Sequence, residues 1–256
     1  MLDLEVGYKT GAGTSLSLRV YGQGYKREEI PLFYPKEELI SLCGNCKGYS
    51  GGCPGYAPYF DDIKPSMPYF YVISVWMDMA WAIKYAGKLD YFRSSYTDRL
   101  TQYYILRVVR RIENVIDSFG LMVGGCSACK ASNGCSVLLG QPCVNPSRRT
   151  YSVEAVGVDC SELHRLMFGV RLPYWYYGQS LQRYMTRYAG LYVRSLDGLD
   201  EVLAVSAAED QSFALPVEPV PAYRLVTLEA PSHTSDAGMK YEAYEKDEDG
   251  NYIKID

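Results

Sequence analysis

The chain has few of the features from which common active sites are built. Only two of its 256 residues are histidines. No glycine-rich, phosphate-binding loop precedes a helical pattern, and no convincing nucleophile–base motif occurs. No basic helix and no platform of basic and aromatic residues stands out, which argues against nucleic-acid binding. We therefore expect the chemistry of this protein to depend on its cysteines.

An export signal and a membrane-spanning run are missing as well. The first residues are acidic and then polar and glycine-rich, unlike a signal peptide. The longest apolar stretch, residues 69–86, is interrupted by Asp78 and Lys84 and predicts a buried strand and helix, not a membrane span. We expect a cytoplasmic protein, whose eight cysteines bind metal more often than they form disulfides.

Seven of the eight cysteines lie in two clusters with short spacings. The first cluster reads Cys-x2-Cys-x6-Cys-Pro, and the second reads Cys-x2-Cys-x5-Cys-x7-Cys. Thiolates gathered by glycine- and proline-rich spacings are typical of sites for a soft metal or an iron–sulfur cluster. The second cluster has enough thiolates for a complete [4Fe–4S] site, whereas the first has three. The clustered residues are Cys43, Cys46, Cys53, Cys126, Cys129, Cys135 and Cys143.

The fourth ligand of the first cluster is open to several interpretations. Cys160 and His164 are four residues apart on a predicted helix, so both project from one face and either could complete the site. Alternatively, one iron has no protein ligand and is open to substrate. The plainer interpretations are a small buried hydrophobe for Cys160 and a helix-surface histidine for His164. Zinc is the rival metal, because the two Cys-x2-Cys pairs together match a tetrahedral zinc site.

Two segments resemble a known family. Residues 43–58 read Cys-Gly-Asn-Cys and then Gly-Gly-Cys-Pro-Gly-Tyr-Ala-Pro, and the second cysteine loop leads into Ser-Val-Glu-Ala-Val-Gly-Val-Asp at residues 152–159. Over about residues 40–195 the chain resembles the DUF2284 family of predicted metal-binding proteins. The resemblance implies a metal site of the iron–sulfur kind and no settled reaction. Ser152, Glu154 and Asp159 then either support the loop that carries Cys143 or act as acid and base beside an open iron.

The pattern of apolar residues predicts an α+β fold. We expect a small mixed β-sheet with packed helices, two cysteine-rich cluster-binding loops that converge at one end, and a β-rich C-terminal extension. The expected strands are residues 2–8, 15–21, 69–75, 191–194 and 223–228, and a terminal hairpin at 240–246 and 251–255. The expected helical segments are residues 35–42, 79–91, 95–119 with Gly120 as the stop, 159–168, and an amphipathic stretch at 178–189.

Charge divides the chain into two parts. Residues 196–256 contain fourteen acidic and four basic residues, a net charge of −10, and since the whole chain carries −4, residues 1–195 carry +6. We expect residues 1–195 to form the cysteine-rich metal- or iron–sulfur-binding domain. Residues 196–256 are expected to be an acidic extension that docks a partner.

Three functions follow from these patterns. The leading hypothesis is an iron–sulfur protein with one or two [4Fe–4S] clusters that transfers electrons as a subunit of a larger redox complex. The second is an enzyme whose first cluster has an open iron. The third is a zinc-stapled structural or assembly protein.

Overall fold

The computed structural model describes residues 1–9, 15–33, 39–40, 50–78, 90–126, 128–129, 134–172, 184–208, 225–228, 241–246 and 252–255. Two predicted ligands, Cys43 and Cys46, lie outside the described residues. The same holds for most of the predicted helix at 35–42 and for the predicted helix start at 79–89.

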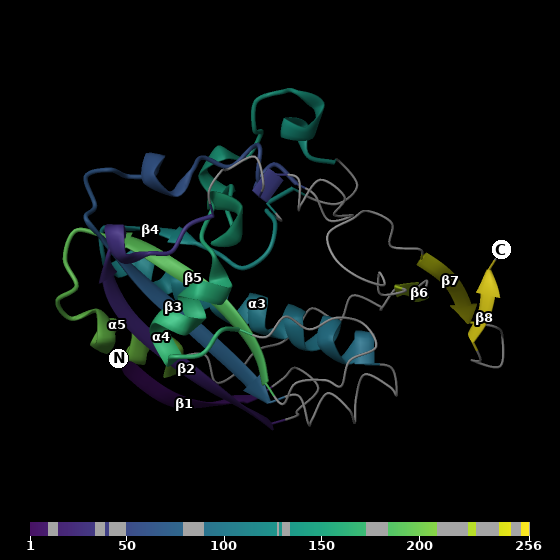
Figure 1. The fold of residues 1–256 in the computed structure, drawn as a ribbon, viewed down its shortest axis with the longest axis horizontal. Helices are drawn as coiled ribbons and strands as arrows, with labels where there is room; N and C mark the ends of the chain where they lie inside the picture. The colour runs from purple at the N-terminus through teal and green to yellow at the C-terminus, as the bar shows by residue number, and fades with distance from the viewer. Residues whose placement is uncertain are drawn as a thin grey trace.

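Five antiparallel strands form the main sheet, in the order β1-β2-β3-β5-β4 (Figure 1). The predicted N-terminal hairpin is confirmed by the pairing of the first two strands, and β3 contains the predicted strand at 69–75. Aromatic and β-branched residues dominate β3, which is buried along most of its length as a central strand should be. The strands are β1 (Leu2–Lys9), β2 (Ser15–Lys26), β3 (Tyr69–Asp78), β4 (Ser118–Leu121) and β5 (Tyr184–Val193).

The α+β class is confirmed, but the expectation of a mixed sheet is wrong, because every strand pairing in this sheet is antiparallel. Helix α3 (Asp90–Val115) carries the chain from β3 to β4, and these two strands run in the same direction. Strand β5 lies between them and pairs with both. Strands β3 and β4 therefore run parallel without pairing with each other, and each pairs antiparallel with β5.

Two hydrophobic cores cover the two faces of the sheet. Because side chains alternate along a strand, Tyr71 and Ile73 of β3 belong to one core, and Phe70 and Val72 belong to the other. Helices α3 and α5 (Leu199–Ala208) complete the first core. Helix α4 (Cys160–Phe168) and the segment that precedes β3 complete the second.

The prediction of a helix at residues 159–168 is confirmed by α4, and Asp159 caps its start. The side chain of Asp159 accepts hydrogen bonds from the backbone N–H groups of Ser161 and Glu162, at 2.9 and 3.1 Å. Gly169, with φ 78°, ends the helix in the left-handed conformation. This is the usual asymmetry of a helix with a carboxylate at the start and glycine at the end.

Two other helix predictions are wrong in their extent. Helix α3 ends at Val115, and Gly120 lies in strand β4, where a Cβ atom would meet Val109 of α3 at 2.5 Å. Gly120 permits the close approach of strand β4 to helix α3. From the sequence, this glycine had been interpreted as a helix stop. In the predicted amphipathic stretch at 178–189, residues from Tyr184 onward belong to β5. No described helix is both long and apolar enough to cross a membrane.

The C-terminal part contains one helix of the main body and a separate small sheet. Helix α5 contributes Leu199, Leu203 and Ala207 to the first core, although it lies beyond the predicted division at residue 195. That division stays a prediction. Strands β7 and β8, which lie within the ranges predicted for a terminal hairpin, pair antiparallel. The strands of the small sheet are β6 (Leu225–Leu228), β7 (Tyr241–Lys246) and β8 (Tyr252–Ile255).

Candidate metal centre

The described part of the first cysteine loop, residues 50–57, lies directly against the second loop. The backbone N–H of Cys126 donates to Ser50 Oγ at 3.0 Å. The backbone N–H of Ser50 donates to Cys53 Sγ at 3.2 Å, and Ser50 Oγ lies 3.6 Å from the same sulfur. Ser50 therefore joins a cysteine of the first loop to a cysteine of the second.

Two glycines allow the backbones of the two loops to touch. A Cβ atom on Gly52 would lie 2.2 Å from the carbonyl oxygen of Thr150, and one on Gly51 would lie 3.0 Å from Cys135 Sγ. A backbone oxygen cannot rotate away as a side chain can, so no larger residue fits at position 52 without moving a loop. The Gly51-Gly52 pair is thus a requirement of this contact.

Arg149 fastens the same contact from the end of the second loop. Its Nε and Nη2 atoms donate to the carbonyl oxygen of Gly51 at 3.1 and 2.6 Å. Nη2 also donates to the carbonyl oxygen of Tyr56 at 2.8 Å, and the guanidinium lies 5.1 Å from the ring centre of Tyr151. A planar guanidinium can bind two carbonyls and an aromatic face at once, which a lysine ammonium cannot.

Several cysteine sulfurs accept hydrogen bonds from nitrogen donors. Such N–H···S bonds are one of the features by which a protein sets the potential of an iron–sulfur cluster. The bonds are Ser50 N–H to Cys53 Sγ at 3.2 Å, Thr150 N–H to Cys126 Sγ at 3.5 Å, and Asn145 Nδ2 to Cys129 Sγ at 3.5 Å.

Among the described cysteines, Cys135 has the sulfur with the most backbone N–H donors. Burial acts to raise the pKa of this thiol, but the backbone N–H groups of Gly51, Leu138 and Val137 donate to the sulfur and lower it. The charge of Arg149 acts in the same direction, and the net pKa of Cys135 lies below its ordinary value. A thiol with a lowered pKa loses its proton to a metal more readily. Gly51 belongs to the first loop, so part of this effect crosses between the loops.

The described residues do not by themselves complete a metal site. Among them, no group of three or more His, Cys, Asp or Glu side chains could hold a metal ion, and all six described cysteines are free thiols. Cys43 and Cys46 lie outside the described residues. The chemistry of the donors fits a soft metal, because the loop cysteines are partly exposed and several have N–H donors at their sulfur. The ligand assignments themselves stay predictions.

Cys160 lies in the second core, where its side chain is 3% exposed. Burial raises the pKa of its thiol well above the ordinary value, and a hydrogen bond with Glu154 and the charge of Asp159 act in the same direction. A thiol kept protonated in this way behaves as a small hydrophobe, which is the plainer of the two interpretations given above. Its role as a cluster ligand is untested.

The expectation of a helix-surface position for His164 is wrong. Its side chain is 4% exposed and belongs to the buried face of α4. The Nδ1 atom is hydrogen-bonded to the hydroxyl of Tyr188, and the ring stacks on Trp76 with 5.6 Å between ring centres. Burial lowers the pKa of the imidazole below its ordinary value of 6.5. Whether His164 binds metal also stays a prediction.

Ser152, Glu154 and Asp159 have local structural partners. Ser152 Oγ accepts the backbone N–H of Ala155 at 3.0 Å, Asp159 caps α4, and Glu154 is hydrogen-bonded to the thiol of Cys160. These contacts favour structural support over acid–base chemistry for the three residues, although they do not reach the loop that carries Cys143.

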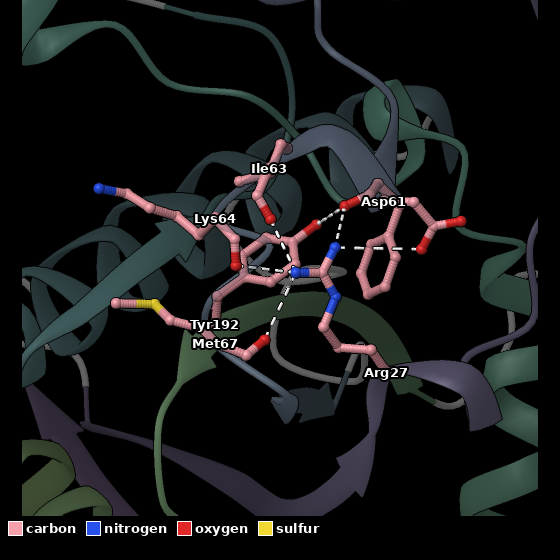
Figure 2. Close-up of polar contacts among 7 residues, drawn as sticks. Arg27, Asp61, Ile63, Lys64, Met67 and Tyr192 are labelled. Carbon is pink, nitrogen blue, oxygen red and sulfur yellow. Dashed lines mark hydrogen bonds and ion pairs between the residues drawn. The ribbon is translucent and has the colours of Figure 1, made fainter.

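Arg27 holds the segment that leads from the first cysteine loop to β3 (Figure 2). Its Nη1 atom donates to the carbonyl oxygens of Ile63 and Lys64 at 2.8 and 2.9 Å. Its Nη2 atom donates to that of Phe60 at 2.8 Å. The guanidinium also packs against the rings of Phe60 and Tyr192, with ring centres at 5.3 and 4.9 Å. This one side chain therefore fixes an irregular segment onto the end of β2.

Sequence reasoning did not single out Ser50, Arg149 or Arg27. Each acts on backbone groups of irregular segments, which carry no periodic pattern. The available signal was the Gly51-Gly52 pair directly before Cys53, because adjacent glycines beside a cysteine indicate close backbone approach.

An α+β fold with seven clustered cysteines is characteristic of a protein that binds a thiophilic metal. The family model described as "Predicted metal-binding protein (DUF2284)" matches residues 33–191, more than half of the chain, and that span includes all eight cysteines. The chain therefore belongs to this family of predicted metal-binding proteins. No curated protein and no solved structure matches the chain.

Proposed function

We propose that this protein carries electrons on an iron–sulfur centre of the [4Fe–4S] type, bound by the cysteines of the two loops. The observation that carries the proposal is the set of nitrogen donors directed at the sulfurs of Cys53, Cys126, Cys129 and Cys135. Such donors stabilise the anionic sulfur that iron binds and tune the potential of a bound cluster.

The number of thiols favours iron–sulfur over zinc. A structural zinc site uses four ligands, so a single zinc ion would leave three of the seven clustered cysteines without a role. Two [4Fe–4S] clusters have eight ligand positions and would use all seven cysteines. When bound, such a cluster supplies one-electron oxidation and reduction.

The surface beside the second loop supports delivery of electrons to another protein. Leu139 lies four residues after Cys135 and Val144 directly after Cys143, and their side chains are 74% and 69% exposed. A contiguous patch of exposed apolar side chains is typical of a surface that another protein covers. We propose that a redox partner or a larger complex binds here, with the acidic residues 196–256 as a second contact.

A redox titration followed by EPR spectroscopy tests the function. Protein purified without oxygen is expected to take up one electron per cluster from dithionite, to give a paramagnetic signal, and to lose that signal on reoxidation. Wild-type protein that contains stoichiometric zinc and gives no signal at any potential would contradict the proposal and favour a structural role.

A further inference from the structure

Resting on the proposed function, we infer that the two cysteine loops serve one shared centre. In this arrangement, Cys53 of the first loop and Cys126 and Cys135 of the second are ligands of the same centre. Ser50 and Arg149 are the residues that position them. The alternative is the arrangement that the spacings alone favour, in which each loop binds its own cluster.

Two consecutive residues contact cysteines of different loops. The N–H of Ser50 donates to Cys53 Sγ at 3.2 Å, and Gly51 packs so close to Cys135 that an added Cβ atom would lie 3.0 Å from its sulfur. Consecutive Cα atoms are about 3.8 Å apart, so one short piece of backbone contacts both thiols. The hydroxyl of the same Ser50 accepts the N–H of Cys126. Three cysteines from two loops thus surround the segment 50–52.

The two loops pack directly against each other beside their cysteines. A Cβ atom on Gly52 would lie 2.2 Å from the carbonyl oxygen of Thr150 and 2.8 Å from the Cβ of Cys126. No group of three or more described donors forms a site for a single metal ion. The centre that the loops would share is therefore a cluster of several irons, bound by cysteines of both loops.

Arg149 acts as a positioning residue for this arrangement. It spans from the second loop to two carbonyl oxygens of the first, at Gly51 and Tyr56. Its neighbour Arg148 is exposed and provides a matched control.

Two single substitutions, Cys53→Ala and Cys135→Ala, separate the shared arrangement from the divided one. The shared centre predicts that both variants, purified without oxygen, lose the same EPR signal and the same amount of iron and sulfide per chain. If Cys53→Ala keeps the signal that Cys135→Ala loses, the inference is overturned while the proposed function stands. Wild-type protein without iron and sulfide would instead overturn the proposed function, and the inference with it.

Substitutions that leave every cysteine in place test the positioning residues. Arg149→Gln is expected to lose iron to a ferrous chelator about tenfold faster than wild type, since outer partners of metal sites affect affinity by about 10–100-fold. Arg148→Gln is expected to match wild type. Gly52→Ala keeps all ligands and charges but forces the loops apart, so it should also lose iron faster. Wild-type rates for both Arg149→Gln and Gly52→Ala, with circular dichroism spectra unchanged, would overturn the inference.

Discussion

Irregular loops leave backbone N–H and C=O groups without partners from helices or strands, and in this protein single side chains supply many of those partners. Ser50 and Arg149 do so between the cysteine loops, and Arg27 does so for the segment before β3. Each links parts of the chain that are far apart in sequence. The consequence is that a few polar residues fix the shape of segments that have little regular structure.

Arg27→Lys tests this principle at a single side chain. An ammonium cannot reach the carbonyl oxygens of Phe60, Ile63 and Lys64 together, so some of these carbonyls lose the charge-assisted hydrogen bond that Arg27 donates. We expect the free energy of unfolding to fall by about 2–3 kcal/mol. Urea unfolding monitored by circular dichroism measures the change.

Arg19→Lys is the matched control for this prediction. Arg19 pairs with Asp3 at 2.7 Å, but both side chains are nearly half exposed, and an exposed ion pair contributes little. Its substitution should change the free energy of unfolding by less than about 0.5 kcal/mol. Equal effects of the two substitutions would show that Arg27 has no special anchoring role.

The buried imidazole of His164 predicts a pH dependence of stability. Because burial lowers its pKa in the folded protein below 6.5, the folded state resists protonation that the unfolded chain accepts. Stability is therefore complete above the unfolded pKa and falls as pH decreases through 6.5 toward the folded pKa. The slope cannot exceed about 1.4 kcal/mol per pH unit for one proton. Urea unfolding between pH 5.5 and 8 measures it.

The variant His164→Gln should lack this slope, because it has no imidazole to protonate. The same substitution at His233 measures what the other histidine contributes. If His164→Gln retains the whole slope of the wild type between pH 5.5 and 7, the assignment to His164 is wrong.

The sequence identified Cys160 and His164 as candidate ligands, but it did not show what surrounds their side chains. Their spacing of four residues correctly placed both on one face of a helix. Whether that face meets solvent or core depends on Tyr188 of β5 and Trp76 of β3, which are distant in sequence. Local patterns contain no information about such a partner, and for this reason the surface interpretation of His164 failed.

At the scale of elements, strand β5 connects the two halves of the sheet, since it pairs with both β3 and β4. It also contains Gly190, where an added Cβ atom would lie 2.1 Å from Cζ of Phe70. Phe70 is fully buried and packs edge-on against Phe60 and Tyr192. The glycine thus makes room for an aromatic ring at the centre of the second core.

Gly190→Ala is expected to lower the free energy of unfolding by about 1–3 kcal/mol, because the Phe70 ring must move within a packed core. Gly7→Ala is the control in β1, where an added Cβ atom has no neighbour within 4 Å. That substitution should be neutral or stabilising by up to about 1 kcal/mol, since alanine is less costly than glycine in a strand. Thermal unfolding of both variants compares them, and an equal response would contradict this packing.

Elements with strong local signals could be predicted from the sequence. Alternation identified the N-terminal hairpin, and the carboxylate cap at Asp159 identified the start of α4. The end of β5 lies in the strand predicted at residues 191–194, but its beginning was assigned to the amphipathic stretch at 178–189. Tyr184 and Tyr188 are four residues apart, a spacing that fits the period of a helix as well as that of a strand. The short edge strand β4 was assigned to the preceding helix, and only pairing with β5 defines it.

At the scale of the whole molecule, the sheet brings together segments that the sequence keeps far apart. Ser50 and Gly51 meet Cys126 and Arg149, although β3 and α3 lie between them in the chain. The spacings of the cysteines indicated a metal site, and the family match agrees with that class of function. Which cysteines bind together depends on tertiary contacts, which the spacings do not encode.

The proposed iron–sulfur centre of the clustered cysteines is tested most directly by the content of iron, acid-labile sulfide and zinc in protein purified without oxygen. We predict iron and sulfide in equal amounts, close to four or eight of each per chain for one or two [4Fe–4S] clusters. Less than about one iron per chain, or stoichiometric zinc without sulfide, would contradict the account.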